Sequence, residues 1–458
     1  MQSKPNPRSP LLGPVVVAGF SAAVAVWCAW FITHLPWIAI SEQLALPIIL
    51  GVWTLTLTAI LSLTERGRAI PAGIGAGALS AAIGLLLLGS KLAPAGSTAS
   101  APSGVQPGAI LIAGGFLVLG TVVGAAAGVL AHLSGRSSPD QSRATWLFRL
   151  ALVDCVAIAP LLFVGGLVTS TNSGMAVPDW PNTFGSNMFL YPIGPRIQAT
   201  MGEPYKQVFL EHAHRLFGTL VGLATLALMI FTLRWDHRRA VRILAVIAFA
   251  IVVVQGVLGG LRVIQDLRLL AMVHGVLAQL VFGCVVALAV VLSPAFRALP
   301  PDASTLLGPA ARRIKMLCTA TLHTLILQLI FGALYRHYRG NHALWTHAGF
   351  SVVVLIFALA AGFILLADPV RRLSAAPTLR RLGSALVAVV VLQFTLGWVA
   401  FVWGGRTLEA DSVPQALIRT AHQANGALLL AVAAAAFVWG KRLARPSNQA
   451  GPVPSPVA

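Results

Sequence analysis

Four of the eleven histidines recur at matched positions in two parts of the chain. His214 and His274 each lie near the start of an apolar segment, and His347 and His422 lie at the corresponding places further along, each followed within four residues by glycine or alanine. Neutral imidazole is a common ligand of heme iron, and facing helices of a bundle hold such cofactors. The pattern therefore predicts two bis-histidine heme sites. The alternative is that these histidines form interhelical hydrogen bonds.

A single carboxylate accompanies the first pair. Glu211 precedes His214 by three residues, which places both side chains on one helix face, whereas Leu344 stands at the matching place before His347. A carboxylate beside a bound ring can accept or donate protons. We expect chemistry at the first site and electron transfer at the second. The alternative is an acid that only stabilises a helix N-terminus.

A long segment at about 170–208 precedes the first pair and is rich in aromatic residues. Asp179, Trp180 and Pro181 form its centre. Long ordered loops in compact proteins are usually functional, so we interpret this one as a lid over the first site. The alternative is an aromatic anchor at the membrane interface.

The composition points to a membrane protein as the framework for these residues. Of 458 residues 57% are apolar and 10% charged, which excludes an ordinary soluble domain, and the mean hydropathy of +0.83 excludes intrinsic disorder. About 20 apolar residues cross a bilayer. Twelve segments meet this criterion: 12–33, 44–64, 70–90, 108–132, 148–170, 210–232, 242–261, 270–293, 316–335, 343–366, 383–404 and 416–438.

The basic residues predict the orientation of these spans. Lys and Arg number 32 against 13 acids, for a net charge of +19. If the N-terminus is cytoplasmic, 22 of the 32 fall on the inner side and ten on the outer side, as the positive-inside rule expects. The charge needs no nucleic-acid partner. We expect a multi-pass protein of the bacterial plasma (inner) membrane, with both termini cytoplasmic and the four histidines toward the outer face.

The last eight spans contain an internal repeat. Gln255 to Gly259 (Gln-Gly-Val-Leu-Gly) returns as Gln393 to Gly397 (Gln-Phe-Thr-Leu-Gly), and the histidine pairs recur with them. We predict an all-α integral membrane protein whose last eight spans are two tandem pseudo-symmetric four-helix bundles. The expected regions are an additional four-helix region at 1–140, bundles at 145–295 and 310–440, and a disordered tail at 446–458.

Together these motifs resemble those of the heme A synthases, which convert heme O to heme A for terminal oxidases. The resemblance covers about residues 145–440. It is carried by Ser173 to Pro181 (SGMAVPDWP), by Glu211-x-x-His214-Arg215, by the two Gln-x-x-Leu-Gly helices and by the four histidines. Residues 1–140 lie outside it, and we assign them only a structural, assembly or partner-binding role. Some members of the family carry a cysteine pair in the loop that corresponds to 170–208. This chain has no cysteine there, which excludes a thiol role for that loop.

The resemblance implies a role for each site residue. His347 and His422 would ligate the iron of a resident heme b, His214 and His274 would ligate or position heme O, and Glu211 would act beside it. The C8 methyl group would be oxidised to a formyl group by successive hydroxylations, with water as oxygen donor. Implied partners are a heme O synthase, an electron acceptor such as quinone, the lipid bilayer and a possible second copy of the chain. The competing hypotheses are a diheme b-type cytochrome that carries electrons from quinol, and a transporter.

Overall fold

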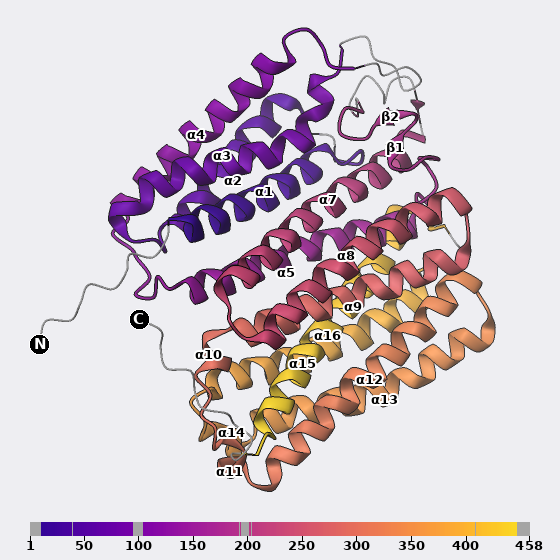
Figure 1. Cartoon of the computed structure of the whole chain (residues 1–458). Helices are drawn as coiled ribbons and strands as arrows, with labels where there is room; N and C mark the ends of the chain where they lie inside the picture. The colour runs from indigo at the N-terminus through magenta and orange to yellow at the C-terminus, as the bar shows by residue number, and fades with distance from the viewer. Residues whose placement is uncertain are drawn as a thin grey trace, which may run out of the picture.

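The computed structural model describes residues 11–38, 40–94, 104–191, 193, 201–202, 204–407 and 409–446. Within them, twelve helices are long and apolar enough to cross a membrane, which confirms the predicted all-α membrane protein (Figure 1). The predicted disordered tail from residue 447 on, and parts of the loop at 170–208, lie outside the described residues. The long helices are α1 (Leu12–His34), α2 (Glu42–Leu61), α3 (Ala69–Leu88), α4 (Ala109–Leu133), α5 (Arg143–Ser170), α7 (Pro204–Trp235), α8 (Arg239–Gln265), α9 (Arg268–Leu292), α12 (Pro309–Tyr338), α13 (Asn341–Leu366), α15 (Ala376–Trp403) and α16 (Val413–Leu443).

Short elements connect the long helices. Two two-residue strands, β1 and β2, pair antiparallel in the loop after α5, with Asn182 opposite Asn187 and Thr183 opposite Ser186. The remaining elements are single turns between the long helices. The bounds of the strands and of these turns are η1 (Arg66–Arg68), η2 (Gly89–Leu92), β1 (Asn182–Thr183), β2 (Ser186–Asn187), α10 (Pro294–Arg297), α11 (Ala303–Leu307) and α14 (Asp368–Arg371).

Several helices are longer than the predicted spans. The segment at 210–232 belongs to α7, which has 32 residues, and α12 and α16 have 30 and 31. A hydrocarbon core of roughly 30 Å needs only about 20 helical residues. The apolar pattern marks the part of each helix in lipid, whereas the hydrogen-bonded helix continues into the polar region, where Pro204 to Gln207 begin α7.

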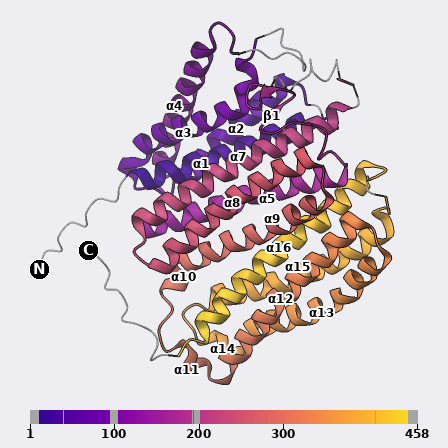
Figure 2. The same cartoon turned by 45° about the vertical axis from the view of Figure 1, so that its right-hand side comes forward.

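The long helices form three groups that lie side by side (Figures 1 and 2). We call α1–α4 the N-terminal block, α5, α7, α8 and α9 the first bundle, and α12, α13, α15 and α16 the second bundle. Helix α1 packs on α5 and α7, and α16 packs on α5 and α9. The first bundle therefore lies between the N-terminal block and the second bundle.

The N-terminal block shares a hydrophobic core with the first bundle. Trp27 of α1 meets Phe217 of α7 with ring centroids 6.1 Å apart, and Phe31 stacks on Phe209 at 5.8 Å. Such aromatic pairs add to the free energy gained from burying apolar area. The block is thus packed onto the first bundle rather than tethered to it.

Glycines bring α3 and α4 into close contact. Gly73 and Gly77 of α3 face Gly120 and Gly124 of α4, and a Cβ atom on any of these four would overlap a backbone carbonyl oxygen of the facing helix. Small residues at such spacing let membrane helices approach closely, where dispersion forces hold them together. The contact of α3 with α4 depends on the absence of these side chains.

We expect Gly124→Ala to destabilise the N-terminal block, because its methyl group overlaps the carbonyl oxygen of Gly73. Overpacking of this kind costs about 1–3 kcal/mol. Thermal unfolding in detergent should show a lower melting temperature. Gly114→Ala is the matched control, since it lies on the same helix with nothing within 4 Å of its Cβ position. Equal melting temperatures for the two variants would contradict this account.

Candidate functional site

The structure brings the four histidines together as two facing pairs. The ring centroids of His214 and His274 are 6.4 Å apart, with the ring planes at 84°. Those of His347 and His422 are 6.2 Å apart, at 90°. Two imidazoles on opposite sides of one metal, each with a metal–nitrogen distance of about 2 Å, have centroids roughly 6 Å apart. Both pairs therefore have the spacing of two axial ligands of one iron.

Each histidine ring lies against a glycine of the preceding long helix. A Cβ atom would lie 3.0 Å from Cε1 of His214 if placed on Gly165, and 3.0 Å from Cε1 of His274 if placed on Gly259. The second bundle repeats the contact, with values of 2.8 Å for Gly332 on His347 and 3.3 Å for Gly397 on His422. Larger residues at these four glycines would displace the rings.

Hydrogen bonding orients the rings in the second bundle. Nδ1 of His347 donates to the carbonyl oxygen of Gln328 at 3.2 Å, which leaves Nε2 with a free lone pair. The contact at His422 is of another kind, because the amide Nε2 of Gln393 is a donor and lies 3.3 Å from Nδ1 and 3.5 Å from Nε2 of this ring. A ligating histidine usually donates one ring N–H to an acceptor, as His347 does, and presents the other nitrogen to the metal.

The first bundle differs in the hydrogen bonds of its histidine rings. Nδ1 of His214 and Nδ1 of His274 are buried without a hydrogen-bond partner, and they face the backbone carbonyls of Leu161 and Gln255. These carbonyls precede the contacting glycines by four residues, as in the second bundle. The anchoring position is therefore present in both bundles.

The repeat is finer than the sequence analysis recognised. The motif Gln-x-x-x-Gly precedes three of the histidines, at Gln255, Gln328 and Gln393, and Leu161 takes the place of glutamine before Gly165. The amides of Gln255 and Gln328 donate to the backbone carbonyls of His274 and His347 at 2.7 and 2.8 Å. The unit is one pair of antiparallel helices, used four times. In the sequence, the further copy of this motif at Gln328 to Gly332 is the signal that indicates this smaller repeating unit.

One cavity of about 980 Å³ contains both histidine pairs. The sequence predicted a separate site in each bundle, and the structure shows that the space around them is continuous. We call the end of the molecule nearest the histidines, where α5 and α12 end and α7 and α13 begin, the histidine end. The lining residues there include Glu211, Trp180 and Pro181, and Arg215 lies beside them.

Glu211 is buried and engaged at both oxygens. Its Oε1 accepts a hydrogen bond from Arg215 at 2.9 Å, and its Oε2 accepts one from the backbone N–H of Val177 at 2.8 Å. Helical spacing predicts its position near His214 but not these partners, since Val177 is 34 residues away. Glu211 thus lines the cavity and also ties the loop to α7.

Arg215 holds the loop from the same helix. Its guanidinium donates to the backbone carbonyls of Asp179 (2.7 Å), Asn182 (2.8 Å) and Val177 (3.0 Å). Arginine can serve several acceptors at once because its five N–H groups form a rigid fork. Arg215 was part of the motif for the resemblance, but its sequence position gives no sign of this role.

Asp179 and Trp180 have different tasks in the loop. The carboxylate of Asp179 accepts the backbone N–H groups of Phe184 (2.8 Å) and Gly185 (2.6 Å), which fixes the turn between β1 and β2. The Trp180 ring fills the space where a Cβ on Gly260 of α8 would lie, and it reaches the cavity.

A tyrosine of the same loop is also buried. Burial raises the pKa of the Tyr191 phenol to about 12, so this group stays neutral.

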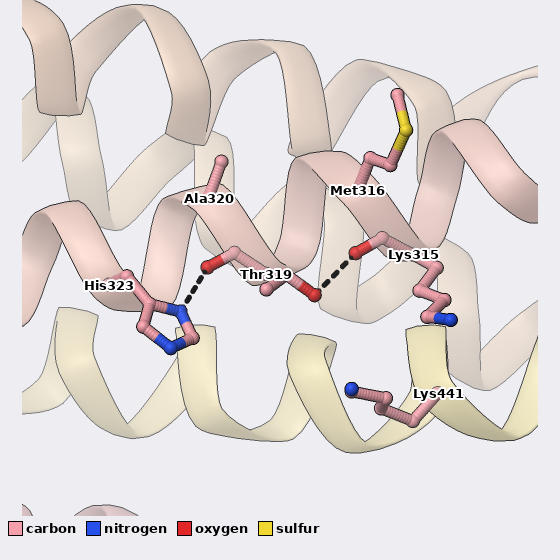
Figure 3. A pocket seen from close by; sticks show the side chains of 6 residues that line it. All are labelled: Lys315, Met316, Thr319, Ala320, His323 and Lys441. Atoms are coloured by element: carbon pink, nitrogen blue, oxygen red, sulfur yellow. Dashed lines mark hydrogen bonds between the residues drawn. The ribbon is translucent and has the colours of Figure 1, made fainter.

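His323 lies apart from the cavity. It borders a shallow surface hollow between α12 and α16, with its Nδ1 2.8 Å from the carbonyl oxygen of Thr319 (Figure 3). The hollow is lined by Lys315, Met316, Thr319, Ala320, His323 and Lys441. Its histidine is not part of a facing histidine pair, so His323 serves as a control residue.

Each histidine pair offers few side chains that could bind a metal ion. In the part of the chain that the structure describes, no three or more His, Cys, Asp and Glu side chains are grouped so as to hold a metal ion. A metal between either pair would have two protein ligands. A porphyrin, which supplies four nitrogens of its own, matches this set.

Comparison with known proteins finds a family that part of the chain resembles. Residues 144–349 match the model of the COX15-CtaA family, described as cytochrome oxidase assembly protein. This confirms the resemblance for that stretch, which includes His214, His274 and His347 and ends before His422. The extra region at 1–140 lies outside the match. No solved structure matches significantly.

Curated relatives share part of this region. A protein named heme A synthase from Exiguobacterium sp. is 32% identical over 120 residues, which cover 25% of this chain and 36% of that protein. A heme A synthase from Shouchella clausii is 30% identical over 145 residues, covering 31% of this chain and 44% of that protein. The chain thus spans less than half the length of these relatives.

We expect Arg215→Gln to release the loop, because charge-assisted hydrogen bonds of about 1.5–3 kcal/mol are lost. Hydrogen exchange of the backbone amides of Val177, Phe184 and Gly185 should accelerate about tenfold or more. Arg268→Gln, at an exposed position at the start of α9, is the control. Unchanged exchange in Arg215→Gln would show that the loop is held by other contacts.

Proposed function

We propose, from the family match of residues 144–349, that this protein is a heme A synthase that oxidises the C8 methyl group of heme O to a formyl group. The observation that carries the proposal is the cavity with two histidine pairs of heme-ligand spacing, of which the first alone has a buried carboxylate beside it. Successive hydroxylations with water as the oxygen donor would release electrons and protons at each step.

Heme fits the residues of both pairs. The rings of each pair face one another at the spacing of axial ligands, and two buried Nδ1 atoms in the first bundle lie at anchoring carbonyls. We propose that His347 and His422 hold a resident heme b, and that His214 and His274 ligate or position heme O. The bound heme b supplies one-electron redox chemistry.

Glu211 is the residue that we propose to handle protons. Its carboxylate lines the cavity one helical turn from His214, and Arg215 holds it in place. A positioned carboxylate can accept protons from water and from the reacting carbon, which each hydroxylation requires. The loop with Asp179, Trp180 and Pro181 covers this end of the cavity and restricts the access of bulk water.

The proposal includes a location and partners. We place the protein in the bacterial inner membrane, with both termini cytoplasmic and the histidine end outward, because that arrangement follows the positive-inside rule. Heme O is too apolar to diffuse freely in water, so a heme O synthase is the natural donor. An acceptor such as quinone would take the electrons, and a second copy of the chain is a further candidate partner.

A diheme b-type cytochrome that carries electrons from quinol is the second candidate. The near-equal spacing of the two histidine pairs, 6.4 and 6.2 Å, favours it, since two alike sites suit electron transfer. A carrier, however, has no need of a buried carboxylate at one pair or of a loop tied to it. These features favour the enzyme.

We expect cells that lack heme A but make heme O to accumulate heme A when they produce this protein. Extracted pigments, separated by chromatography, give the measurement. Glu211→Gln should keep heme b and lose most of the conversion, while Glu409→Gln, at an exposed site, should behave as the wild type.

Two outcomes would count against these roles. If the wild-type chain yields neither heme A nor its hydroxylated precursor while heme O accumulates, the enzyme hypothesis is wrong and the cytochrome remains. If Glu211→Gln converts heme O at the wild-type rate, the carboxylate only positions the loop.

We also expect His347→Ala and His422→Ala each to abolish the low-spin heme b spectrum, because one axial ligand of a bis-histidine site is lost. His323→Ala is the matched control on the surface of α12. Absorption spectra of the purified, reduced protein give the measurement. A wild-type spectrum in either variant would reject the assignment of heme b to the second bundle.

A further inference from the structure

The loop after α5 touches the N-terminal block as well as α7. Its strands β1 and β2 lie beside the block in both views (Figures 1 and 2). The contact is made by η2, the single turn that follows α3, in which Gly89 is buried. A Cβ atom on Gly89 would overlap the carbonyl oxygen of Phe189 and would lie 2.9 Å from its carbonyl carbon. The block therefore reaches the backbone of the loop directly.

A side chain that turns away could not relieve this overlap. The atoms that a Cβ on Gly89 would meet first belong to the backbone of Phe189, and the Cβ of Phe189 would lie at 3.5 Å. Gly89 itself has helical dihedral angles (φ −53°, ψ −32°), which any residue can adopt, so the position does not require the backbone freedom of glycine. What the contact requires is the missing side chain, which lets the loop come this close.

The side chain of Phe189 adds a second contact between the loop and the block. It packs against the hydrophobic core that the block shares with the first bundle. Ile83 and Leu87 of α3 belong to this core, together with Phe209 of α7. Phe209 precedes Glu211 by two residues. The end of α3, the loop and the start of α7 are therefore packed as one unit.

A short chain of contacts joins Phe189 to the carboxylate of the first site. The backbone N–H of Phe189 donates to Oδ1 of Asn187 in β2 at 2.9 Å, and Asn187 is paired with Asn182 in β1. The carbonyl oxygen of Asn182 accepts a hydrogen bond from Arg215, which forms the ion pair with Glu211. The β1–β2 hairpin is thus held from two sides, by the N-terminal block at Phe189 and by α7 at Asn182.

We propose that the N-terminal block is the second anchor of the loop and that Gly89 is a positioning residue for the first site. The contact at Gly89 sets how close the β1–β2 hairpin comes to the block. Trp180 and Pro181 directly precede this hairpin and line the cavity, so they take their place together with it. The inference goes beyond the proposed function, because the position of the loop does not depend on what the cavity binds. It gives a role to the region at 1–140, which lies outside the family match.

The test is backbone hydrogen exchange in the full-length chain. We expect Gly89→Ala to accelerate exchange of the Phe184 and Gly185 amides about tenfold, which corresponds to about 1.4 kcal/mol, because the methyl group displaces the loop at Phe189. Gly89→Val, with its larger side chain, should accelerate exchange further. Gly114→Ala is the matched control in the same block, with nothing within 4 Å of its Cβ position, and should exchange as the wild type does.

Gly124→Ala separates positioning of the loop from stability of the block. It disturbs the contact of α4 with Gly73 of α3, which lies 16 residues before Gly89, roughly 24 Å along the helix. If the block acted on the loop only through its own stability, Gly124→Ala and Gly89→Ala would accelerate exchange of the loop amides alike. We expect the acceleration in Gly89→Ala and not in Gly124→Ala. Equal acceleration in both variants overturns the positioning role of Gly89.

A double-mutant cycle with Arg215→Gln tests whether the two anchors hold the same hairpin. While Arg215 holds Asn182, the hairpin cannot move away from a methyl group on Gly89, whereas a released hairpin can. We therefore expect Gly89→Ala to accelerate exchange less in the Arg215→Gln background than in the wild type. Additive effects of the two substitutions would show two independent contacts and would overturn the proposal of one doubly anchored hairpin.

Phe189→Ala tests the anchor in case Gly89→Ala does not fold. It removes a partly buried ring from the shared core and adds no overlap. Exchange of the Phe184 and Gly185 amides should again accelerate about tenfold, and unchanged exchange overturns the proposal.

Failure of the proposed function looks different from failure of this inference. If no heme A forms in cells while the loop amides respond as described, the anchor stands and the enzyme hypothesis is wrong. If the chain makes heme A, Gly89→Ala should lower kcat several-fold and leave the low-spin heme b spectrum of the second pair unchanged. A wild-type kcat together with accelerated loop exchange would overturn the role of Gly89 for the first site.

Discussion

The packing of an imidazole ring against a glycine of the neighbouring helix is the contact on which the site depends. At Gly332 a side chain would place a carbon 2.8 Å from Cε1 of His347, closer than real Cβ contacts allow. At this position the missing side chain lets α12 and α13 approach until the carbonyl oxygen of Gln328 accepts a hydrogen bond from Nδ1 of His347. The other ring nitrogen then points into the bundle. The packing of a ring on a glycine is repeated at all four histidines, so the placement of both histidine pairs follows from one local rule.

The parts of the structure that could be predicted from the sequence are those with a local or periodic signal. Twelve spans follow from apolar length, and the histidine pairs follow from their recurrence, because both signals are local or periodic. The partners of Glu211 could not be predicted, since Val177 N–H belongs to a distant loop. The joint lining of the cavity by Arg262 of α8 and Arg336 of α12 could not be predicted either, because it depends on how the two bundles pack. The shared cavity is likewise a product of packing.

The contact between the N-terminal block and the first bundle could not be predicted from the sequence either. Nothing in its sequence identifies the face that contacts the rest of the chain, because α1 is apolar all round. The structure shows that Trp27 and Phe31 pack into the core of the first bundle, next to α7, the helix that carries Glu211 and His214. Helix α1 packs on α5 and α7 from this side, and α16 packs on α5 and α9 from the other. The block is therefore in direct contact with the helix of the first histidine, His214.

The difference between the two sites comes from one connection. The four helix pairs are alike, but α12 and α13 are joined by two residues, Arg339 and Gly340, whereas α5 and α7 are joined by the segment 171–203. This insertion supplies Val177 to Glu211, carbonyl acceptors to Arg215, and the Trp180 ring to the cavity. Among the described lining residues, the second pair has no carboxylate that matches Glu211. A duplicated arrangement of histidines thus gains two different surroundings through the length of one loop, and the residues that hold this loop belong to the same helix turn as the first histidine.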